Sequence, residues 1–486
     1  MVCGAWACSN DRDVDPDVPG GNGYTDGEDK CMLLLRISPV DAGEAAATEV
    51  TERIKSLRII VLTAPDDEGG TEGSTGGAGG ADGGTDGGNG GTGGTDGSGG
   101  ANDGAAAVPE IEYNRLITPA EFGTTTAAGF QYEIMLLTTK GKKDIYLIAN
   151  EGSVGDIKYQ PAEGSTLTGL PTTFSAFLER YEAADGKTPD AAEFKKAVEA
   201  IYFAPTYNTP DTEKDALYLP YTSHYEVEAV EGKENKLTMY LVPVATKFTF
   251  KFVNKLDSDV TVNEISVKST DTHNFLLARV GEDDYEKDFV NDDGTKTKMY
   301  WVNWLAKVAE ATHNAPGNNA AINERYGWIS DYGIPMASTA ETVFIDENDK
   351  VTIPAKKTED KDGSTTETPG VVVLGPYYRP ESRREITYKK PGTDENGNEF
   401  EETITEHEYL LTLDLKDEDN VGPEFKDVVI KELRALFRDT SVYITVTMSS
   451  GDVEVYAEIS GWNRHEAKGS VNNGDDGKYV DPDKQQ

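Results

Sequence analysis

Apolar residues alternate with polar residues over several long stretches, and this period of two limits the fold more than any other feature. Residues 248–252 carry phenylalanine at every second position, with threonine or lysine between. The same alternation recurs in residues 442–448 and 453–459 and, with one break after Val262, in residues 260–267. Successive side chains of a strand point to opposite faces, so each stretch can bury one face of a sheet and leave the other in water. The chain is therefore predicted to be mostly β.

The first part of the chain has related patterns. Residues 31–40 are apolar on both alternating faces, which predicts a strand covered on both sides, and residues 57–63 form a second β-branched run. Residues 130–136 alternate, a Lys-Gly-Lys turn follows, and residues 145–149 are apolar again. A turn between two such runs predicts a β-hairpin.

Two short segments have helical spacing instead. Bulky apolar residues recur three or four positions apart in residues 174–181, after Thr172 and Thr173, and in residues 194–201, after Asp190. Threonine and aspartate are favoured at helix N-caps, where their oxygens accept from the first backbone N–H groups. Two amphipathic helices are predicted, and their aromatic stripes indicate core packing rather than a cofactor site.

Charge and glycine are unevenly distributed. The 486 residues include 46 basic and 87 acidic side chains, for a net charge of −41. This charge would repel nucleic acid and anionic lipid, which excludes both as partners. Residues 66–104 contain 19 of the 50 glycines, eight acids and no base. Such a composition cannot form a core, so a disordered Gly-rich insertion is predicted there.

Four regions follow from these patterns. Residues 1–30 form an acidic tether, and residues 31–242 form a first β domain. The restart of β structure after the helical interval marks a second domain at residues 243–465, with polar insertions at 356–370 and 392–402. A polar tail, residues 466–486, ends the chain.

The three cysteines, Cys3, Cys8 and Cys31, all precede the predicted domains or open the first one. No disulfide can therefore staple the body of the chain. The sequence Ala-Trp-Ala-Cys8, followed by an acidic run, is similar to a bacterial lipobox and predicts lipid attachment at Cys8, the alternative being a plain thiol in a flexible tail. No apolar run is long enough to span a bilayer, so any membrane contact is expected through that lipid alone.

Searches for catalytic motifs find none, and the chain is expected not to be an enzyme. The five histidines stand singly, without metal-ligand spacing. Acidic clusters near residues 292, 346 and 394 lack the EF-hand register, which favours solvated turns over calcium sites. We expect no metal and no cofactor. A hydrolase built on distant carboxylates remains an alternative.

Several motifs carry a family resemblance by their order. The run Arg438 to Tyr443 precedes an alternating strand, and Trp462 ends the next one. Other motifs lie at residues 144–150 (DIYLIAN), 219–221 (LPY), 241–247, 334–338 (IPMAS) and 377–382 (YYRPES). Together they resemble the fimbrillins of the Bacteroidales, the type V pilins, over nearly the whole predicted folded chain. Asp439 stands where the family usually has Asn, and the Tyr comes one position later.

The resemblance implies two transthyretin-like β-sandwich domains with a few short helices, and a structural role in fimbriae at the cell surface or outer membrane. In stalk subunits of the family, an arginine-specific protease removes the lipidated leader together with the first strand. A strand of a neighbouring subunit then fills the open groove, which is β-strand addition. The implied partners are other fimbrial subunits, with host or bacterial surface ligands a further possibility.

Applied to this chain, the resemblance implies a set of site residues. The removable first strand consists of Met32, Leu33, Leu34, Leu35 and Ile37. Processing would follow Arg36 or Arg53, although both also fit ordinary solvated side chains. The candidate donor strand consists of Val453, Val455, Ala457, Ile459 and Trp462. The chain is expected either to polymerise by this exchange or to keep its leader as an anchor, tip or accessory pilin. The tail beyond Trp462 has few apolar residues and would be a weak donor, which favours the second alternative.

A second function class remains open. Trp301 and Trp304, in a chain with 23 tyrosines, could form stacking platforms for sugars. This alternative is a glycan-binding surface lipoprotein.

Overall fold

The structure is a computed structural model, and it describes the following residues: 30–39, 52–63, 109–118, 120–121, 131–161, 166–182, 189–205, 218–231, 234–268, 270–278, 286–290, 294–300, 341–346, 348–361, 364–383, 386–393, 399–406, 409–416, 424–430, 433, 435–450 and 452–462. Several predictions concern residues outside these ranges: the tether with Cys8, the insertion at 66–104, the motif at 334–338, Trp301, Trp304 and the polar tail.

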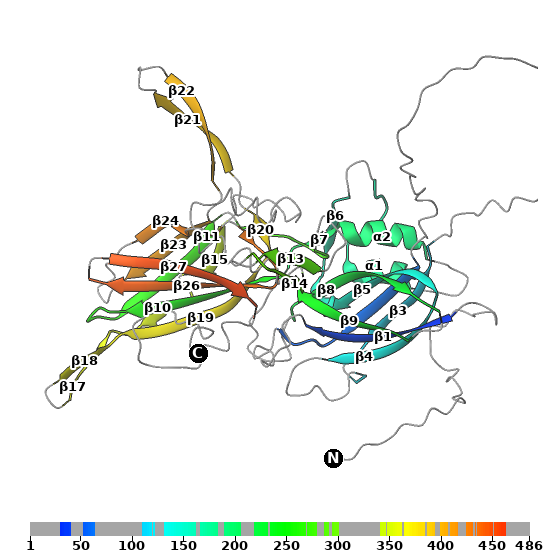
Figure 1. The fold of residues 1–486 in the computed structure, drawn as a ribbon. Coiled ribbons are helices and arrows are strands. Elements are labelled where there is room, and N and C mark those ends of the chain that lie inside the picture. Colours follow the sequence, from blue (N-terminus) through cyan, green and yellow to red (C-terminus); the bar gives the residue numbers. More distant parts are fainter. Residues whose placement is uncertain are drawn as a thin grey trace, which may run out of the picture.

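The described chain is mostly β, with two short α-helices, as the alternation predicts (Figure 1). The first sheet has seven strands, in the order β3 (Ile111–Ile117), β2 (Leu57–Thr63), β5 (Gly141–Ala149), β8 (Tyr221–Ala229), β9 (Glu234–Pro243), β1 (Lys30–Pro39) and β4 (Tyr132–Thr139). Strands β1 and β9 are parallel, and the other neighbours in this sheet are antiparallel.

This sheet bends into two leaves. Strands β8 and β9 pair only where Tyr221 and Thr222 lie opposite Pro243 and Val242. One leaf is β3-β2-β5-β8 and the other is β9-β1-β4. Apolar residues from both leaves share one buried cluster, the inner core, which includes Leu33, Leu35, Ile37, Leu57, Ile59, Val61, Ile145 and Leu147. Two sheet faces that enclose one core form a β-sandwich.

The predicted hairpin between residues 130–136 and 145–149 is wrong. Both strands exist, but β4 pairs with β1 while β5 pairs with β2 and β8. The turn at Lys140 therefore carries the chain from one leaf to the other. Ile134 of β4 and Ile145 of β5 still contact the same inner core. The alternation identified the buried face correctly, but it could not show which strand lies beside which.

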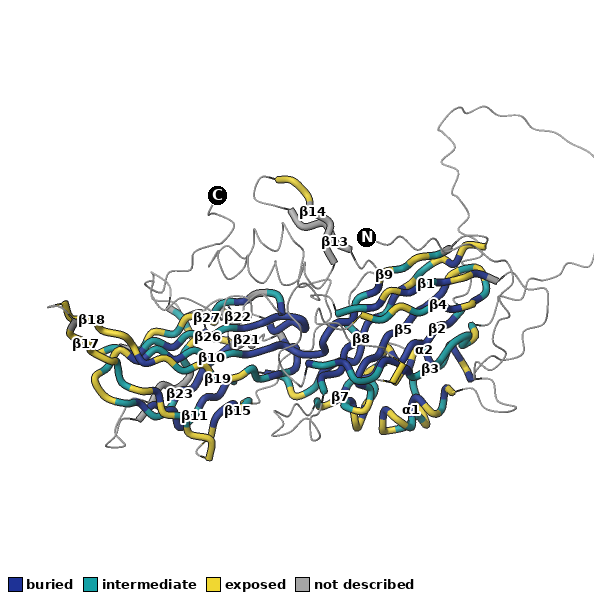
Figure 2. The backbone as a smooth tube through the Cα atoms, turned by 90° about the horizontal axis from the view of Figure 1, so that it is seen from below, coloured by how far each residue is buried: buried dark blue, intermediate teal, exposed yellow. Residues whose placement is uncertain are grey.

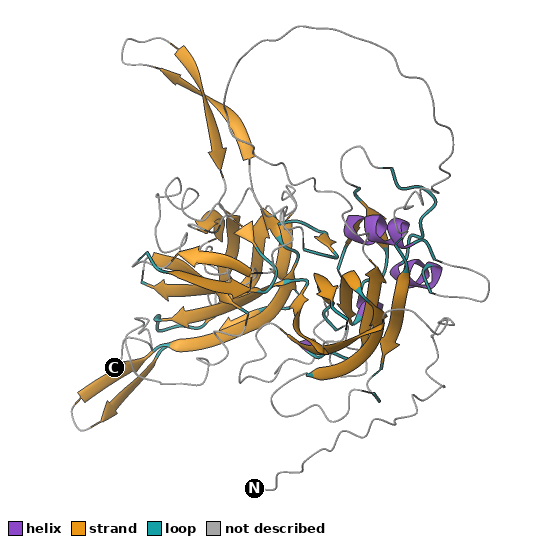
Figure 3. Cartoon of the chain, turned by 45° about the vertical axis from the view of Figure 1, so that its right-hand side comes forward, coloured by secondary structure: helices purple, strands orange, loops and turns teal. Residues whose placement is uncertain are grey.

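The two predicted helices and both of their caps are confirmed. Helices α1 (Phe174–Arg180) and α2 (Ala191–Ala200) begin after Thr173 and Asp190, whose side-chain oxygens accept from the backbone N–H of Ala176 and Glu193. They cover the outer face of the β2-β5 leaf (Figure 3). Neither helix is long or apolar enough to cross a membrane, which holds for every helix within the described ranges.

A three-stranded sheet borders the helical layer. It has the order β12 (Asn274–Phe275), β7 (Ile201–Phe203) and β6 (Ile157–Tyr159), and the single-turn 3-10 helix η2 (Glu151–Ser153) precedes β6. Ile201 was expected to extend the second helix, but it opens β7 instead. Its β-branched side chain fits the strand better than a helix end.

The second half of the chain forms two facing sheets. One has the order β19 (Gly370–Arg379), β10 (Thr246–Asn254), β26 (Thr440–Ser449) and β27 (Asp452–Gly461). The other has the order β15 (Glu341–Ile345), β11 (Val260–Lys268), β23 (Tyr409–Lys416) and β24 (Glu424–Ile430), with β16 (Val351–Ile353) also on β11. A second core, the outer core, lies between them (Figure 2). The alternating stretches 442–448 and 453–459 are strands as predicted, and they pair with each other as antiparallel β26 and β27.

Four further two-stranded sheets complete the described chain. They are β13 (Glu286–Val290) with β14 (Lys296–Tyr300), β17 (Lys357–Lys361) with β18 (Ser364–Thr368), β20 (Ser382–Arg383) with β25 (Ala435–Leu436), and β21 (Ile386–Thr393) with β22 (Glu399–Glu406). The β17-β18 and β21-β22 hairpins arise within or beside the two predicted polar insertions and project away from the sheets (Figure 1).

Candidate functional site: strand β1 and the junction beside it

Strand β1 fills a slot between two other strands. It runs parallel to β9 and antiparallel to β4, so that Leu35 lies opposite Leu237 on one side and Ile134 on the other. Leu33 and Leu35 are 0% exposed and Ile37 is 1% exposed. Burying an aliphatic side chain of this size is worth roughly 1.5–3 kcal/mol. These three residues thus supply a large share of the attachment of β1 to the inner core.

The other face of β1 is not covered, contrary to the prediction. Met32 is 43% exposed, Arg36 is exposed and Leu34 is half-buried. The reason is that the β9-β1-β4 leaf packs on the inner core with one face, while the helical layer lies behind the other leaf. Apolar residues on both faces of a strand therefore did not mean two covered faces here.

The two leaves are also linked at their far edges. Glu112 of β3 accepts hydrogen bonds from the hydroxyls of Thr138 and Thr139 on β4. The buried ammonium of Lys143 lies 3.2 Å from the same carboxylate and donates to the Thr139 hydroxyl at 2.7 Å. This edge bridge holds β4 against β3 through side chains. If β1 were removed, a gap one strand wide would open between β9 and a β4 that is still attached elsewhere.

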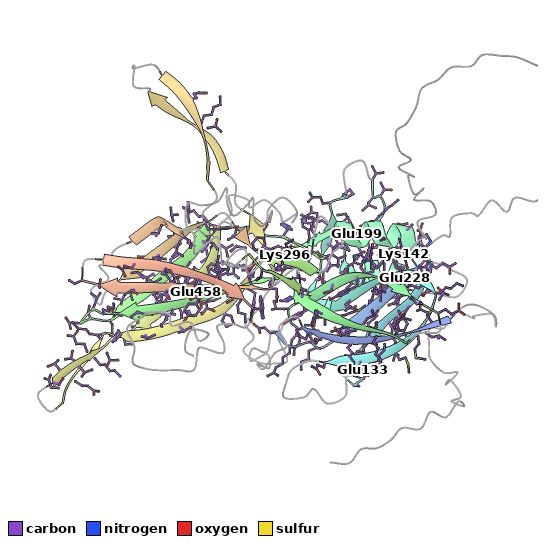
Figure 4. The ribbon with its side chains drawn as sticks, in the orientation of Figure 1. Glu133, Lys142, Glu199, Glu228, Lys296 and Glu458 are labelled. Atoms are coloured by element: carbon purple, nitrogen blue, oxygen red, sulfur yellow. The ribbon has the colours of Figure 1, made fainter. Side chains whose placement is uncertain are left out.

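Arg36 lies inside β1. Its side chain is exposed and its Nε donates to Glu133 of β4 at 2.8 Å, with about 60% of the arginine side chain and 55% of the glutamate exposed. Figure 4 shows Glu133 on this leaf. The backbone of Arg36 has a neighbouring strand on each side, with Glu133 and Thr238 as its paired residues. A protease could reach the side chain here, but the backbone is held within the sheet.

Arg53 lies just before β2, in a segment held by Asn150. The Asn150 side-chain amide donates to the carbonyls of Arg53 at 3.0 Å and Leu219 at 2.7 Å, and its oxygen accepts from the N–H of Lys55 at 2.8 Å. Asn150 has a φ of 56°, a left-handed conformation that asparagine tolerates better than most residues. The last residue of the motif at 144–150 thus fixes the backbone at one of the two candidate processing positions.

Glu52, which precedes Arg53, joins the two halves of the molecule. Its carboxylate lies 2.8 Å from the ammonium of Lys247 and accepts from the Tyr378 hydroxyl at 2.9 Å. Its backbone carbonyl accepts from Tyr221 at 2.9 Å. The side chains of Glu52 and Lys247 are only 2% and 3% exposed. Sequence reasoning missed Glu52 because a single acid in a polar connection carries no pattern of its own.

Trp462 completes this group, here called the junction cluster: Glu52, Lys247, Tyr378 and Trp462. The Trp462 ring stacks on Tyr378 with the ring centres 5.9 Å apart and an interplanar angle of 23°. The Lys247 ammonium lies 4.6 Å from the centre of the Trp462 ring. Trp462 follows β27, yet it packs in the inner core of the first sheet. The end of β27 therefore crosses from its own sheet to the other half of the molecule.

The rest of the candidate donor strand lies in its own sheet. β27 pairs with β26 over its whole length and forms the edge of that sheet. Ala457 and Ile459 are buried in the outer core, while Val453 and Val455 are half-buried against it. These residues already have a place in the subunit to which they belong.

Two of the sequence motifs meet in another buried ion pair. Arg438 donates from Nε to Glu381 at 3.0 Å, and both side chains are almost wholly buried. Its other nitrogens donate to the carbonyls of Phe275 at 2.7 Å and Leu276 at 3.2 Å. Asp439 has a φ of 59°, which Asn and Asp adopt more readily than most residues. Aspartate therefore fits this backbone position, as asparagine would.

One group of the described residues has the make-up of a metal site. Asp144, His224 and Glu226 lie close together, with His224 Nε2 2.8 Å from Asp144. The ammonium of Lys195 already lies 2.9 Å from Asp144 and 3.2 Å from Glu226. Burial alone would raise the pKa of Asp144, but hydrogen bonds from His224 and Lys195 outweigh burial and lower the pKa. The lysine takes the place of a cation, so we assign no metal here.

Comparison with known proteins gives structural matches only. No family model and no curated protein matches the chain. Its fold is similar to the tip fimbrial protein Mfa3 of Porphyromonas gingivalis, at 9% identity and a TM-score of 0.37, over 89% of this chain and 100% of the other. A fimbrial assembly protein of Parabacteroides distasonis matches at 12% identity and a TM-score of 0.33, over 88% and 94%. These are fimbrial proteins of the Bacteroidales, the group that the sequence resembles. At such low TM-scores and identities the matches assign no function to this chain.

Proposed function

We propose that this protein is a structural subunit of cell-surface fimbriae. It would consist of two transthyretin-like β-sandwich domains, residues 31–242 and 243–465, joined at the junction cluster. In one form, proteolysis removes the first strand and a neighbour's strand replaces it. In the other form, the leader is kept and the chain acts as an anchor, tip or accessory pilin. The ordered motifs of the sequence support this family of functions.

The observation that carries the proposal is the position of β1. It is the first described strand, it lies between β9 and β4, and its inner residues Leu33, Leu35 and Ile37 are fully buried. Its loss would leave unpaired backbone groups on both neighbouring strands and an apolar floor between them. Such a groove binds an extended segment through backbone hydrogen bonds and alternate apolar side chains.

The geometry also states what a replacement strand must look like. It must run parallel to β9 and antiparallel to β4, and it must present apolar side chains at the positions of Leu33, Leu35 and Ile37. The proposed donor lies within or just beyond Val453 to Trp462. Within that range, Val453, Val455, Ala457 and Ile459 have the required spacing of two.

The stalk form is tested with purified full-length protein and an arginine-specific protease. We expect loss of an amino-terminal fragment after Arg36 or Arg53, identified by terminal sequencing, followed by detergent-resistant oligomers on a gel. Arg36→Lys and Arg53→Lys keep the positive charge but block that protease, so they identify the position used. If the treated protein stays uncleaved and forms no such oligomers, the stalk form is excluded.

The anchor form is tested at Cys8. If the leader is kept and lipidated, the full-length protein is attached to the outer membrane, and Cys8→Ala releases it into the medium. Cys3→Ala is the matched control, because it removes a neighbouring thiol outside the lipobox-like sequence. Unchanged surface attachment of Cys8→Ala would exclude a lipid anchor at this position.

A further inference from the structure

The junction cluster links a residue near the start of the described chain with the last one. Glu52 precedes β2, Lys247 lies on β10, Tyr378 lies on β19, and Trp462 follows β27. Lys247 and Tyr378 are paired residues on neighbouring strands, so their side chains leave the sheet side by side. Both reach the same oxygen of Glu52, at 2.8 and 2.9 Å. A single carboxylate therefore sets the positions of two side chains from the other half of the molecule.

These two side chains are the ones that hold Trp462. Lys247 faces the ring at 4.6 Å and Tyr378 stacks on it. A cation above an indole ring is attracted by the ring's negative face, and the attraction is stronger when water is excluded. Because Lys247 is buried, the carboxylate of Glu52 also compensates its charge. Without Glu52, the ammonium loses the acid that keeps it at the ring, and Tyr378 loses a hydrogen bond that fixes its plane.

We propose that Glu52 is a latch for the carboxy-terminal end of β27: it positions Lys247 and Tyr378, and these hold Trp462 against the inner core. β27 is an edge strand with β26 as its one strand partner in the described part of the chain. Its end is therefore more dependent on Trp462 than an interior strand would be. The residue that controls this end lies on the leader side of Arg53.

The consequence for processing rests on the proposed function. Hydrolysis of the Arg53–Ile54 peptide bond adds the water's hydroxyl to the Arg53 carbonyl carbon and a proton to the Ile54 nitrogen. Glu52 then leaves with the leader. Such cleavage would open the slot of β1 and loosen the end of β27 in one step. Cleavage after Arg36 would leave Glu52 attached and the latch closed.

Hydrogen–deuterium exchange of the full-length monomer tests the latch. Glu52→Gln keeps the shape of the side chain and removes its charge. We expect peptides covering residues 452–462 to exchange about tenfold faster or more, because a hydrogen bond to a charged group gives protection of this order. Tyr378→Phe keeps the stacked ring and loses only its hydroxyl, so a smaller increase is expected. Tyr225→Phe is the control, since this buried tyrosine donates to Tyr240 within the first sheet and should not change residues 452–462.

The reverse coupling gives a second measurement. If Glu52 holds Trp462, then Trp462→Phe must loosen residues 52–56, because coupling between two sites is reciprocal. Unchanged exchange at 452–462 in both Glu52→Gln and Tyr378→Phe would overturn the latch. If Glu52→Gln does not fold, Tyr378→Phe and Trp462→Phe decide the question. All of these experiments use the uncleaved monomer. They can therefore refute the latch while fimbrial assembly is observed, and they can support the latch in a protein that does not assemble.

Discussion

The first and last described strands are attached to the protein in different ways. β1 has a partner strand on each side, and its inner side chains are fully buried in the core of its own sheet. Within the described residues, β27 has one partner strand, two half-buried valines, the buried Ala457 and Ile459, and a terminal tryptophan that packs in the core of the other half. The chain is thus held firmly along the whole length of β1, but β27 depends strongly on its end.

This difference separates two ways of exchanging a strand. A strand like β1 cannot leave while it is covalently joined to the rest, because both hydrogen-bonded edges and four buried side chains must be given up together. A strand like β27 can loosen from one end when its anchor is disturbed. If the protein exchanges strands, cutting the chain suits the first strand and release of an anchor suits the last.

The largest expected effect is on the free energy of unfolding when a buried side chain of β1 is shortened, compared with a half-buried one of β27. Leu35→Ala should lower the free energy of unfolding by about 2–5 kcal/mol, since it removes a wholly buried side chain from β1. Val455→Ala on β27 should cost roughly 1 kcal/mol, because that valine is only half-buried. Urea unfolding at constant pH measures both. Equal losses in the two variants would contradict the contrast drawn between the strands.

The stability of the protein measured over a range of pH should show a contribution from the first sheet, through Asp144. The pKa of Asp144 on β5 is lowered in the folded protein, so its contribution to stability is complete above its unfolded pKa of about 4 and is lost as the pH falls below that value. Asp144→Asn should cost roughly 1–3 kcal/mol at pH 7 and flatten the loss of stability below pH 4. Asp360→Asn, on the exposed β17, is the control. Parallel pH curves for Asp144→Asn and wild type would refute this assignment.

The edge bridge predicts an intermediate effect. Glu112→Gln keeps the hydrogen-bond acceptor for Thr138 but removes the charge beside buried Lys143, at a cost of roughly 1–2 kcal/mol. Faster hydrogen exchange should appear in β4 and not in β27. Glu121→Gln, at a more exposed position near β3, is the matched control. If hydrogen exchange became faster to the same extent in both halves of the molecule, the bridge would not hold β4 specifically.

The smallest expected effect concerns Arg36. Arg36→Ala breaks an exposed pair with Glu133 and should change stability by less than about 1 kcal/mol, an effect that salt weakens further. Thermal unfolding at low and high salt measures it. A loss as large as that of Leu35→Ala would show that the outer face of β1 is covered in solution.

How far the sequence could predict these features depends on whether a local pattern carried them. Residues 57–63 matched β2, and Thr173 and Asp190 marked the two helix starts, because alternation and capping act within a few residues. The pairing of β4 with β1 rather than β5 was not predictable in this way, since both arrangements bury the same side chains. The prediction that the outer face of β1 is covered was wrong for a similar reason. An apolar side chain favours burial, but it does not show whether another element lies against it.

The candidate site shows the same limit. Arg438, Glu381 and Lys247 lie in motifs that the resemblance identified, yet the sequence did not show that Glu381 would pair with Arg438 or that Glu52 would pair with Lys247. Lys247 directly precedes the phenylalanine run 248–252 and is in phase with its polar positions, yet it is 3% exposed in the structure. Arg438 and Glu381 are 57 positions apart and Lys247 and Glu52 are 195 positions apart, so these contacts depend on how the sheets are joined, and no local pattern records that.

Cys31 gives β1 a reporter of its own. Its thiol lies on the inner face of the strand at 1% exposure, and the chain has no cysteine after it. A thiol reagent can modify it only when β1 opens or leaves, so the labelling rate counts those events. A subunit that has lost β1 together with the residues before it would carry no thiol at all. Oxidants that modify cysteine would then have no target in that subunit.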